Sequence, residues 1–203
     1  MGSENAQPTP QRLYVHDDIT EEVAAEFGVD SEVQRIARQL LAIVSRDIDR
    51  VTVLTLRRQI DALVEREHHE PFDVALGIGE AGERVARQVH ERAGWFPDVH
   101  RVDITRVEDG RGGYVLDGTE GRSWEDQVGG MAEAKSLAVV DDTVFSGLTM
   151  RSVLKALPGR VLPVTRAFCL RGVAESIGMI GGIVPTSAGF AAPGRILDEV
   201  SFI

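Results

Sequence analysis

The sequence is poor in cysteine and in long apolar runs, and each shortage excludes a class of protein. Its 203 residues contain one cysteine, Cys169, so a disulfide framework within the chain is excluded, and the apolar run around this thiol predicts a buried, inert position. No apolar stretch approaches about 20 residues, the length that a membrane-spanning helix needs. The first residues lack the apolar centre of a signal peptide, so we expect a cytoplasmic protein without a membrane partner.

Positive charge is also in short supply. The chain has 22 Lys and Arg residues against 32 Asp and Glu residues, which gives a formal net charge of −10. Binding to a phosphate backbone depends on clustered Lys and Arg, so the charge balance argues against a nucleic-acid partner. A hydrophobic share of 43% with 27% charged residues is instead typical of a soluble globular protein.

The chain divides into a short polar start and one predicted domain. Residues 1–11 are predicted to be disordered, and residues 12–203 to form a single α/β domain. Ser31 is a good cap for a helix whose apolar positions run from Val33 to Ile48. A second helical pattern runs from Val53 to Val64.

From residue 72 onward, short apolar runs alternate with turns and helical patterns. Strands are predicted at 72–76, 99–104, 136–140 and 161–170, and helices at 84–93 and 150–157. Repeated strand–turn–helix units imply right-handed crossovers, and therefore a parallel sheet flanked by helices on both faces. The fold class is α/β.

A long glycine-rich stretch interrupts this pattern at about 106–134. Loops of such length inside a compact domain are usually functional, so we expect a lid. Tyr114 and Trp124 favour a loop that closes over a ligand.

Two adjacent carboxylates, Asp141 and Asp142, follow the apolar run that ends at Val140. In an open parallel sheet, ligands bind at the carboxyl ends of the strands. Two neighbouring carboxylates there can accept hydrogen bonds from two sugar hydroxyls. The loop that follows contains Ser146, Gly147 and Thr149 and precedes a helix, whose first N–H groups suit a phosphate. The segment therefore predicts a sugar-phosphate site.

The string Val139-Val140-Asp141-Asp142-Thr143-Val144-Phe145-Ser146-Gly147-Leu148-Thr149 resembles the phosphoribosyl diphosphate (PRPP) motif of type I phosphoribosyltransferases. The turn Gly77-Ile78-Gly79-Glu80-Ala81-Gly82 resembles that family's pyrophosphate loop, and the stretch after Arg106 resembles its lid. The matched segments cover roughly 72–170. The remainder would build a small hood that selects the acceptor.

The resemblance implies a fold, a reaction and a role for each matched residue. The protein would be a Mg²⁺-dependent phosphoribosyltransferase of nucleotide metabolism that moves 5-phosphoribose to a nucleobase or related nitrogen heterocycle, and a homodimer. Asp141 and Asp142 would hold the ribose hydroxyls and, through water or those hydroxyls, the metal. Arg106 would bring positive charge to the reaction. The phosphate-binding residues would be Thr143, Val144, Phe145, Ser146, Gly147, Leu148 and Thr149 at the 5′-phosphate, and Gly79, Glu80, Ala81 and Gly82 at pyrophosphate.

Two residues depart from the family pattern. Phe145 stands where some purine enzymes of the family have an acid, and an aromatic residue there is more similar to the uracil phosphoribosyltransferase and pyrimidine-operon regulator branch. The pyrophosphate loop contains no basic residue, and Glu80 adds a negative charge to it. A carboxylate that points at pyrophosphate repels the ligand.

Two alternatives stay open. Gly77, Gly79 and Gly82 also spell the dinucleotide fingerprint, and Asp103 follows about 20 residues later, which would make the protein an NAD(P)-dependent oxidoreductase. A non-catalytic sensor of PRPP or a nucleotide is the other alternative, favoured by the lack of a basic residue in the pyrophosphate loop. The adjacent His68 and His69 lack the partners of a zinc site and are expected to be solvated.

Overall fold

The structure is a computed structural model that describes residues 13–16, 19–44, 51–108, 110, 114–118, 123–131, 133–159, 161–193 and 198–200. These residues belong to two compact units, one of residues 1–56 with 197–203 and one of residues 57–196. The predicted disorder of residues 1–11 lies outside the described residues, and a single domain over 12–203 stays a prediction. None of the helices in the described ranges combines the length and the apolar character that crossing a bilayer requires.

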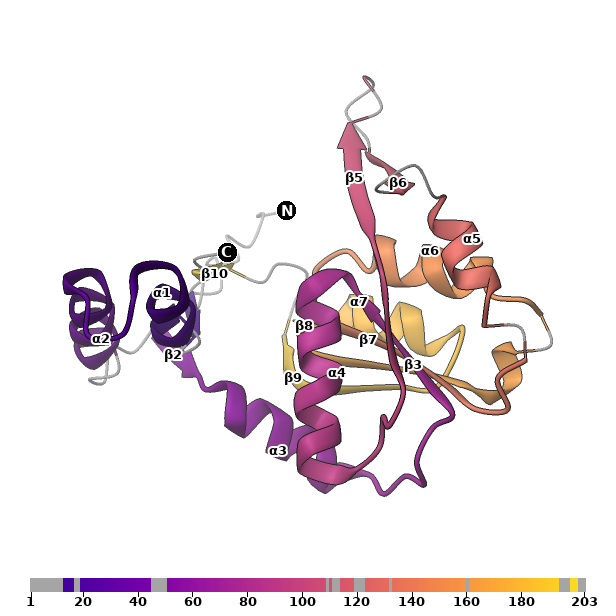
Figure 1. Cartoon of the computed structure of the whole chain (residues 1–203), viewed down its shortest axis with the longest axis horizontal. Helices are drawn as coiled ribbons and strands as arrows, with labels where there is room; N and C mark the ends of the chain where they lie inside the picture. The colour runs from indigo at the N-terminus through magenta and orange to yellow at the C-terminus, as the bar shows by residue number, and fades with distance from the viewer. Residues whose placement is uncertain are drawn as a thin grey trace, which may run out of the picture. The chain divides into compact units, whose positions relative to one another are not determined.

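The first unit contains a three-stranded parallel sheet and a helical hairpin (Figure 1). In the sheet, β1 (Leu13–His16) lies between β10 (Asp198–Val200) and β2 (Val51–Leu54). The helices α1 (Ile19–Phe27) and α2 (Glu32–Val44) connect β1 to β2. The crossover therefore has the β–α–β form that a parallel pair requires.

The predicted cap of α2 is confirmed, but its predicted apolar face is mostly not the buried one. The hydroxyl of Ser31 accepts a hydrogen bond of 3.2 Å from the backbone N–H of Gln34. Ala37 packs against Val23 of α1. Val33, Ile36 and Leu40, by contrast, are exposed.

The second predicted helix begins later than its apolar pattern suggested. Val53 belongs to β2, where it pairs with Val15 of β1, and α3 runs from Leu56 to Arg66. The apolar spacing that indicated a helix therefore begins within a strand, and this strand pairs with β1 from a distant part of the chain.

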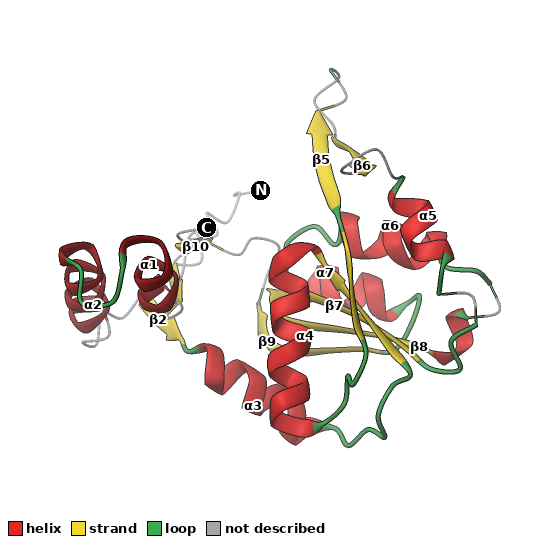
Figure 2. Cartoon of the chain, in the orientation of Figure 1, coloured by secondary structure: helices red, strands yellow, loops and turns green. Residues whose placement is uncertain are grey.

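The second unit is built on a five-stranded parallel sheet with the order β4-β3-β7-β8-β9, which confirms the predicted α/β class (Figure 2). The strands are β3 (Val74–Ile78), β4 (Val99–Val102), β7 (Leu137–Val144), β8 (Thr165–Val173) and β9 (Thr186–Ala192). The chain moves from β3 to β4 in one direction and from β7 to β9 in the other.

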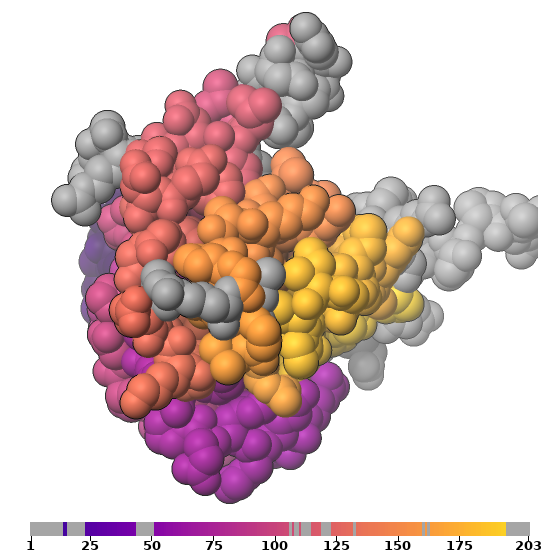
Figure 3. Space-filling view, turned by 90° about the vertical axis from the view of Figure 1, so that its right-hand side faces the viewer, coloured from indigo at the N-terminus to yellow at the C-terminus, as the bar shows by residue number. Residues whose placement is uncertain are grey.

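Helices flank this sheet on both sides. The chain reverses its direction across the sheet between β4 and β7, so right-handed crossovers place α4 (Gly79–Ala93) opposite α6 (Leu148–Ala156) and α7 (Ala174–Gly181). Side chains of α6 and α7 pack on the sheet together with Val128 of α5 (Trp124–Gly129). In Figure 3, α6 in orange and α7 in yellow form neighbouring parts of the surface.

The stretch predicted as a lid contains a two-stranded antiparallel hairpin. Its strands are β5 (Ile104–Glu108) and β6 (Tyr114–Gly118), with Val107 opposite Val115. Trp124 is 9% exposed and belongs to the core, so it anchors α5 rather than closing over a ligand. A lid over 106–134 stays a prediction.

His69 is packed among aromatic rings, so the expectation that it is solvated is wrong. Its ring centroid lies 4.8 Å from that of Trp95 and 5.4 Å from that of Phe168. Its Nε2 atom lies 2.8 Å from the carboxylate of Glu67, which also accepts a hydrogen bond from Ser187. These residues tie the segment before β3 to the amino ends of β8 and β9.

Candidate functional site

The candidate site lies where β3 and β7 separate at their carboxyl ends. In the sheet, β4 lies beside β3 on the side away from β7. The strands β8 and β9 lie on the other side of β7. Such a reversal of strand order is the place where open α/β sheets bind ligands. The loop after β3 and the loop after β7, the two segments that the sequence singled out, therefore both start at this point.

The two segments are in direct contact. A Cβ atom placed on Gly82, in the first turn of α4, would lie 2.6 Å from the carbonyl oxygen of Val140 and 3.4 Å from the Cα atom of Asp141. Only glycine allows helix and strand to approach this closely. The predicted pyrophosphate loop and the strand that bears the predicted ribose carboxylates are thus packed against each other.

The turn after β3 is shorter than predicted. Gly77 and Ile78 belong to the strand, and α4 begins at Gly79, whose φ of 63° is the left-handed conformation that glycine favours. Gly77 serves packing, since a Cβ there would lie 2.4 Å from the Cα atom of Glu83. Residues 79–82 therefore form the first turn of a helix.

Asp141 and Asp142 lie within β7 rather than after it, because the strand continues to Val144 alongside β8. Asp141 is 8% exposed, and its Oδ1 atom accepts a hydrogen bond of 2.9 Å from the backbone N–H of Asp142. The side chain of Asp142 is 31% exposed. One carboxylate is thus held within the protein and the other opens toward solvent.

Arg171 lies beside this pair and was not predicted from the sequence. It is 3% exposed, it lies opposite Thr143 in the register of β7 and β8, and its Nη2 atom is 3.7 Å from Oδ2 of Asp142. The hydroxyl of Thr143 donates to the same Oδ2 atom at 3.1 Å. One sequence signal could have identified it. Arg171 is an ionisable residue that directly follows the apolar run 167–170, where the strand reaches the proposed ligand-binding edge.

The loop between β7 and α6 is fixed from behind by α7. The hydroxyl of Ser176 donates a hydrogen bond of 2.5 Å to the carbonyl oxygen of Phe145. Gly147 has a φ of 70°, and a Cβ there would meet Ile180 at 3.4 Å. Ser176, buried in α7, is a second residue that sequence reasoning missed.

The predicted phosphate-binding residues after Asp142 differ in exposure. Phe145, Ser146 and Leu148 are exposed, whereas Val144 and Thr149 are buried. The hydroxyl of Ser146 accepts a hydrogen bond of 3.3 Å from the N–H of Leu148. The exposed part of the loop is therefore the part that a ligand can reach.

Two helix N-termini meet this edge of the sheet. Neither α4 nor α6 has a side-chain hydrogen bond at its N-cap residue, which is Ile78 in one and Gly147 in the other. The N-terminal N–H groups of a helix, together with its dipole, favour anions. Two anionic groups can therefore bind on either side of Asp141 and Asp142.

Glu80 is exposed in the first turn of α4, and Ala81 is half-buried. The exposed carboxylate adds negative charge at one of the two anion-binding helix ends. The backbone N–H groups at this helix end favour a phosphate group, whereas the negative charge of Glu80 repels it.

Arg106 and Asp103 follow β4. The side chain of Arg106 lies outside the described side chains, so its predicted role stays a prediction. The carboxylate of Asp103 lies 2.8 Å from the Nε atom of Arg101. A dinucleotide-binding site would need the carboxylate of Asp103 to bind a ribose, and in the structure this carboxylate is paired with Arg101.

A metal ion at this site would need ligands from a substrate. In the part of the chain that the structure describes, no group of three or more His, Cys, Asp or Glu side chains could hold a metal ion. Mg²⁺ commonly binds through one or two carboxylates together with substrate phosphates and water. Asp141 and Asp142 fit such a partial ligand set.

Cys169 is buried, as predicted. It lies opposite Asp141 in the register of β7 and β8, which the sequence did not predict. Burial raises the pKa of its thiol far above the ordinary value, and the negative charges of Asp141 and Asp142 raise the pKa further. The thiol therefore stays protonated and unreactive.

Comparison with known proteins finds matches among solved structures alone. No protein-family model and no curated protein matches the chain. A hypothetical protein from Neisseria gonorrhoeae with bound ppGpp is 22% identical, and the match covers 70% of this chain and 81% of that one with a TM-score of 0.49. A purine phosphoribosyltransferase from Pyrococcus horikoshii Ot3 is 19% identical, with 71% and 86% covered and a TM-score of 0.49. The Helicobacter pylori xanthine-guanine-hypoxanthine phosphoribosyltransferase is 15% identical, with 71% and 86% covered and a TM-score of 0.44.

Proposed function

We propose that this protein is a Mg²⁺-dependent phosphoribosyltransferase that moves 5-phosphoribose from PRPP to a nitrogen acceptor and releases pyrophosphate. The observation that carries the proposal is the contact of Gly82 with Val140 and Asp141, which joins an anion-binding helix end to a pair of sugar-binding carboxylates. PRPP requires both, because its ribose bears a phosphate at one end and a diphosphate at the other.

Each part of PRPP has a counterpart in the site. Asp141 and Asp142 accept hydrogen bonds from the ribose hydroxyls. The loop 143–149 and the N-terminus of α6 bind the 5′-phosphate, and residues 79–82 bind the diphosphate through backbone N–H groups. Mg²⁺ would neutralise charge on the diphosphate when bound, and Asp141 and Asp142 would hold it through water or the ribose hydroxyls.

The reaction forms a bond between the acceptor nitrogen and the anomeric carbon. The bond from that carbon to the diphosphate oxygen breaks, and pyrophosphate leaves with the electron pair. Negative charge grows on the departing group, and preorganised N–H groups at the start of α4 stabilise it. Phe145 cannot take a proton, so the acceptor is one that is nucleophilic without a side-chain base at this position. Pyrimidine-like heterocycles are our first choice.

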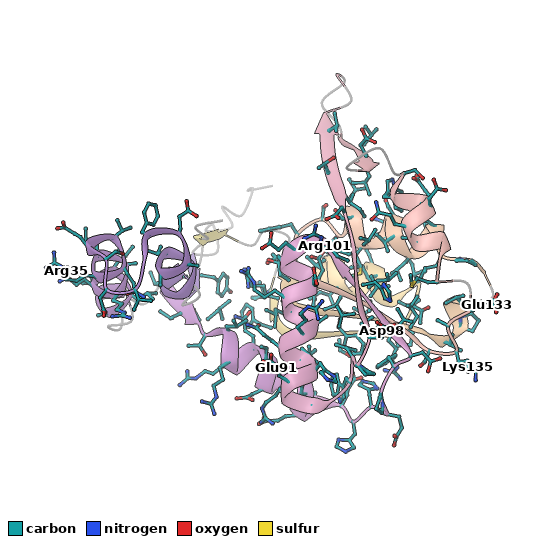
Figure 4. All side chains as sticks on the ribbon, in the orientation of Figure 1. Arg35, Glu91, Asp98, Arg101, Glu133 and Lys135 are labelled. Atoms are coloured by element: carbon teal, nitrogen blue, oxygen red, sulfur yellow. The ribbon has the colours of Figure 1, made fainter. Side chains whose placement is uncertain are left out.

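The test is a screen of nucleobases and small heterocycles with PRPP and MgCl₂, measured by pyrophosphate release. The paired variant Asp141→Asn with Asp142→Asn should lose PRPP binding in calorimetry. Asp98→Asn makes the same change at an exposed carboxylate before β4 (Figure 4) and should bind normally. Unchanged affinity in the paired variant would refute the site.

The same measurements separate the alternatives. Mg²⁺-dependent binding of PRPP without turnover of any acceptor would indicate a non-catalytic sensor. Affinity for NADH without affinity for PRPP would indicate an oxidoreductase. A homodimer in the cytoplasm remains our expectation for the transferase, and gel filtration with light scattering measures its mass.

A further inference from the structure

Beyond the site that the sequence predicts, the structure contains a buried guanidinium that touches one of the two carboxylates. Arg171 is 3% exposed at the carboxyl end of β8, between Thr143 of β7 and Phe190 of β9 in the strand register. A charge buried to this extent is costly unless it is paired. Its ion pair with Asp142 joins an interior charge to a carboxylate at the surface of the site.

The contacts of Asp142 are unevenly distributed between its two oxygen atoms. Both the hydroxyl of Thr143 and the guanidinium of Arg171 approach Oδ2, at 3.1 Å and 3.7 Å. Among the described residues, no hydrogen bond or ion pair involves Oδ1. Because the side chain is 31% exposed, Oδ1 is the oxygen that remains for a ligand.

We propose that Arg171 is a positioning residue that fixes the rotation of the Asp142 carboxylate and thereby makes the site selective for ribose over 2-deoxyribose. This inference rests on the proposed function, in which the carboxylates bind the ribose hydroxyls. Arg171 does not touch the sugar. It holds Oδ2 from inside the protein, so that Oδ1 faces the hydroxyl that distinguishes the two sugars.

The geometry also separates this role from general support of the fold. The phosphate-binding loop is held by other contacts, from Ser176 to Phe145 and from Gly147 to Ile180. Loss of the guanidinium should therefore leave the phosphate end of the site in place. Affinity for a ligand without a sugar should not change.

The test measures three ligands by calorimetry: ribose 5-phosphate, 2-deoxyribose 5-phosphate and inorganic phosphate. The wild-type protein should prefer the ribose compound, and Arg171→Gln should reduce that preference about tenfold, the effect of one lost charge-assisted contact. Affinity for inorganic phosphate should stay the same. Arg171→Lys keeps the charge and should restore most of the preference.

Two results would overturn the inference: an unchanged preference in Arg171→Gln, or an equal loss of affinity for all three ligands. If Arg171→Gln does not fold, Thr143→Val removes the hydroxyl from the same Oδ2 atom and should reduce the preference by a smaller factor, whereas an unchanged preference there contradicts the proposal. A wild-type protein with no preference for the ribose compound would also overturn the inference, whereas a wild-type protein that binds neither sugar phosphate would overturn the proposed function itself.

Discussion

Gly82 and Val140 approach each other so closely that a single added methyl group cannot fit between them. The added carbon would lie 2.6 Å from the carbonyl oxygen of Val140, and a backbone atom of a central strand cannot move aside as the end of a side chain could. The start of α4 is therefore positioned by contact with the strand that bears the two carboxylates.

Gly82→Ala should destabilise the protein by about 1–3 kcal/mol, the usual cost of overpacking, and should weaken pyrophosphate binding as α4 shifts. Urea unfolding and calorimetry measure the two effects. Gly178→Ala in α7 is the matched control, because a Cβ there meets nothing within 4 Å. It should be neutral or stabilising by up to about 1 kcal/mol. Equal losses in the two variants would contradict the packing argument.

Glu80→Lys should strengthen binding of pyrophosphate severalfold, because it replaces a repelling charge by an attracting one at the N-terminus of α4. The gain should shrink as salt is added, since the side chain is exposed. Glu91→Lys makes the same change of charge near the other end of α4. In Figure 4, Glu91 lies away from Arg101, which pairs with Glu83 near the start of the helix. Glu91→Lys should leave the affinity unchanged, and a gain there would show that net charge alone is responsible.

Ser176→Ala should weaken binding of a sugar phosphate by about 1 kcal/mol, because it releases the carbonyl of Phe145 from α7. Ser136→Ala removes a comparable hydrogen bond, in which the N–H of Asp73 donates to the Ser136 hydroxyl, at the amino ends of β3 and β7. Both variants should lose some stability in urea unfolding. A loss of affinity in Ser136→Ala as well would mean that ligand binding simply follows stability.

His69 should make the protein less stable in mild acid. Burial lowers the pKa of His69 below its ordinary value of 6.5, the charge of Arg166 lowers it further, and Glu67 only partly offsets this. The unfolded chain then binds the proton more tightly, so this contribution to stability is complete above pH 6.5 and is lost as the pH falls through the window below it. The melting temperature should drop as the pH falls below about 6.5.

The control for this acid effect is the neighbouring residue. His69→Gln should reduce the drop in melting temperature, whereas His68→Gln, at an exposed position, should keep it. Burial also acts to raise the pKa of Glu67, but hydrogen bonds from Ser187 and His69 and the charges of His69 and Arg166 outweigh it, and the pKa lies below 4.5. The stability contributed by Glu67 is therefore present above pH 4.5 and is lost at lower pH. Identical pH curves for the two histidine variants would exclude His69 as the cause.

The local pattern of the sequence predicted β3, α4, β4, β7, α6 and β8, because buried strands and amphipathic helices have distinct spacings of apolar residues. It left α5, α7 and β9 unassigned. It assigned Gly77 to a turn, whereas Gly77 belongs to β3. In a sequence, a glycine that allows close packing looks the same as a glycine that allows a turn. The local pattern also missed β2, whose partner Val15 is distant in the chain. Arg171 escaped for the same reason, because its partner Asp142 lies on another strand.

The pairing of Leu13 with Asp198 has a consequence for which unit can fold alone. The third strand of the small sheet comes after every strand of the five-stranded sheet, which is complete by Ala192. The unit with the proposed ligand site can therefore fold without β10, whereas the first unit cannot complete its sheet without it. A released chain that ends before β10 should still bind PRPP.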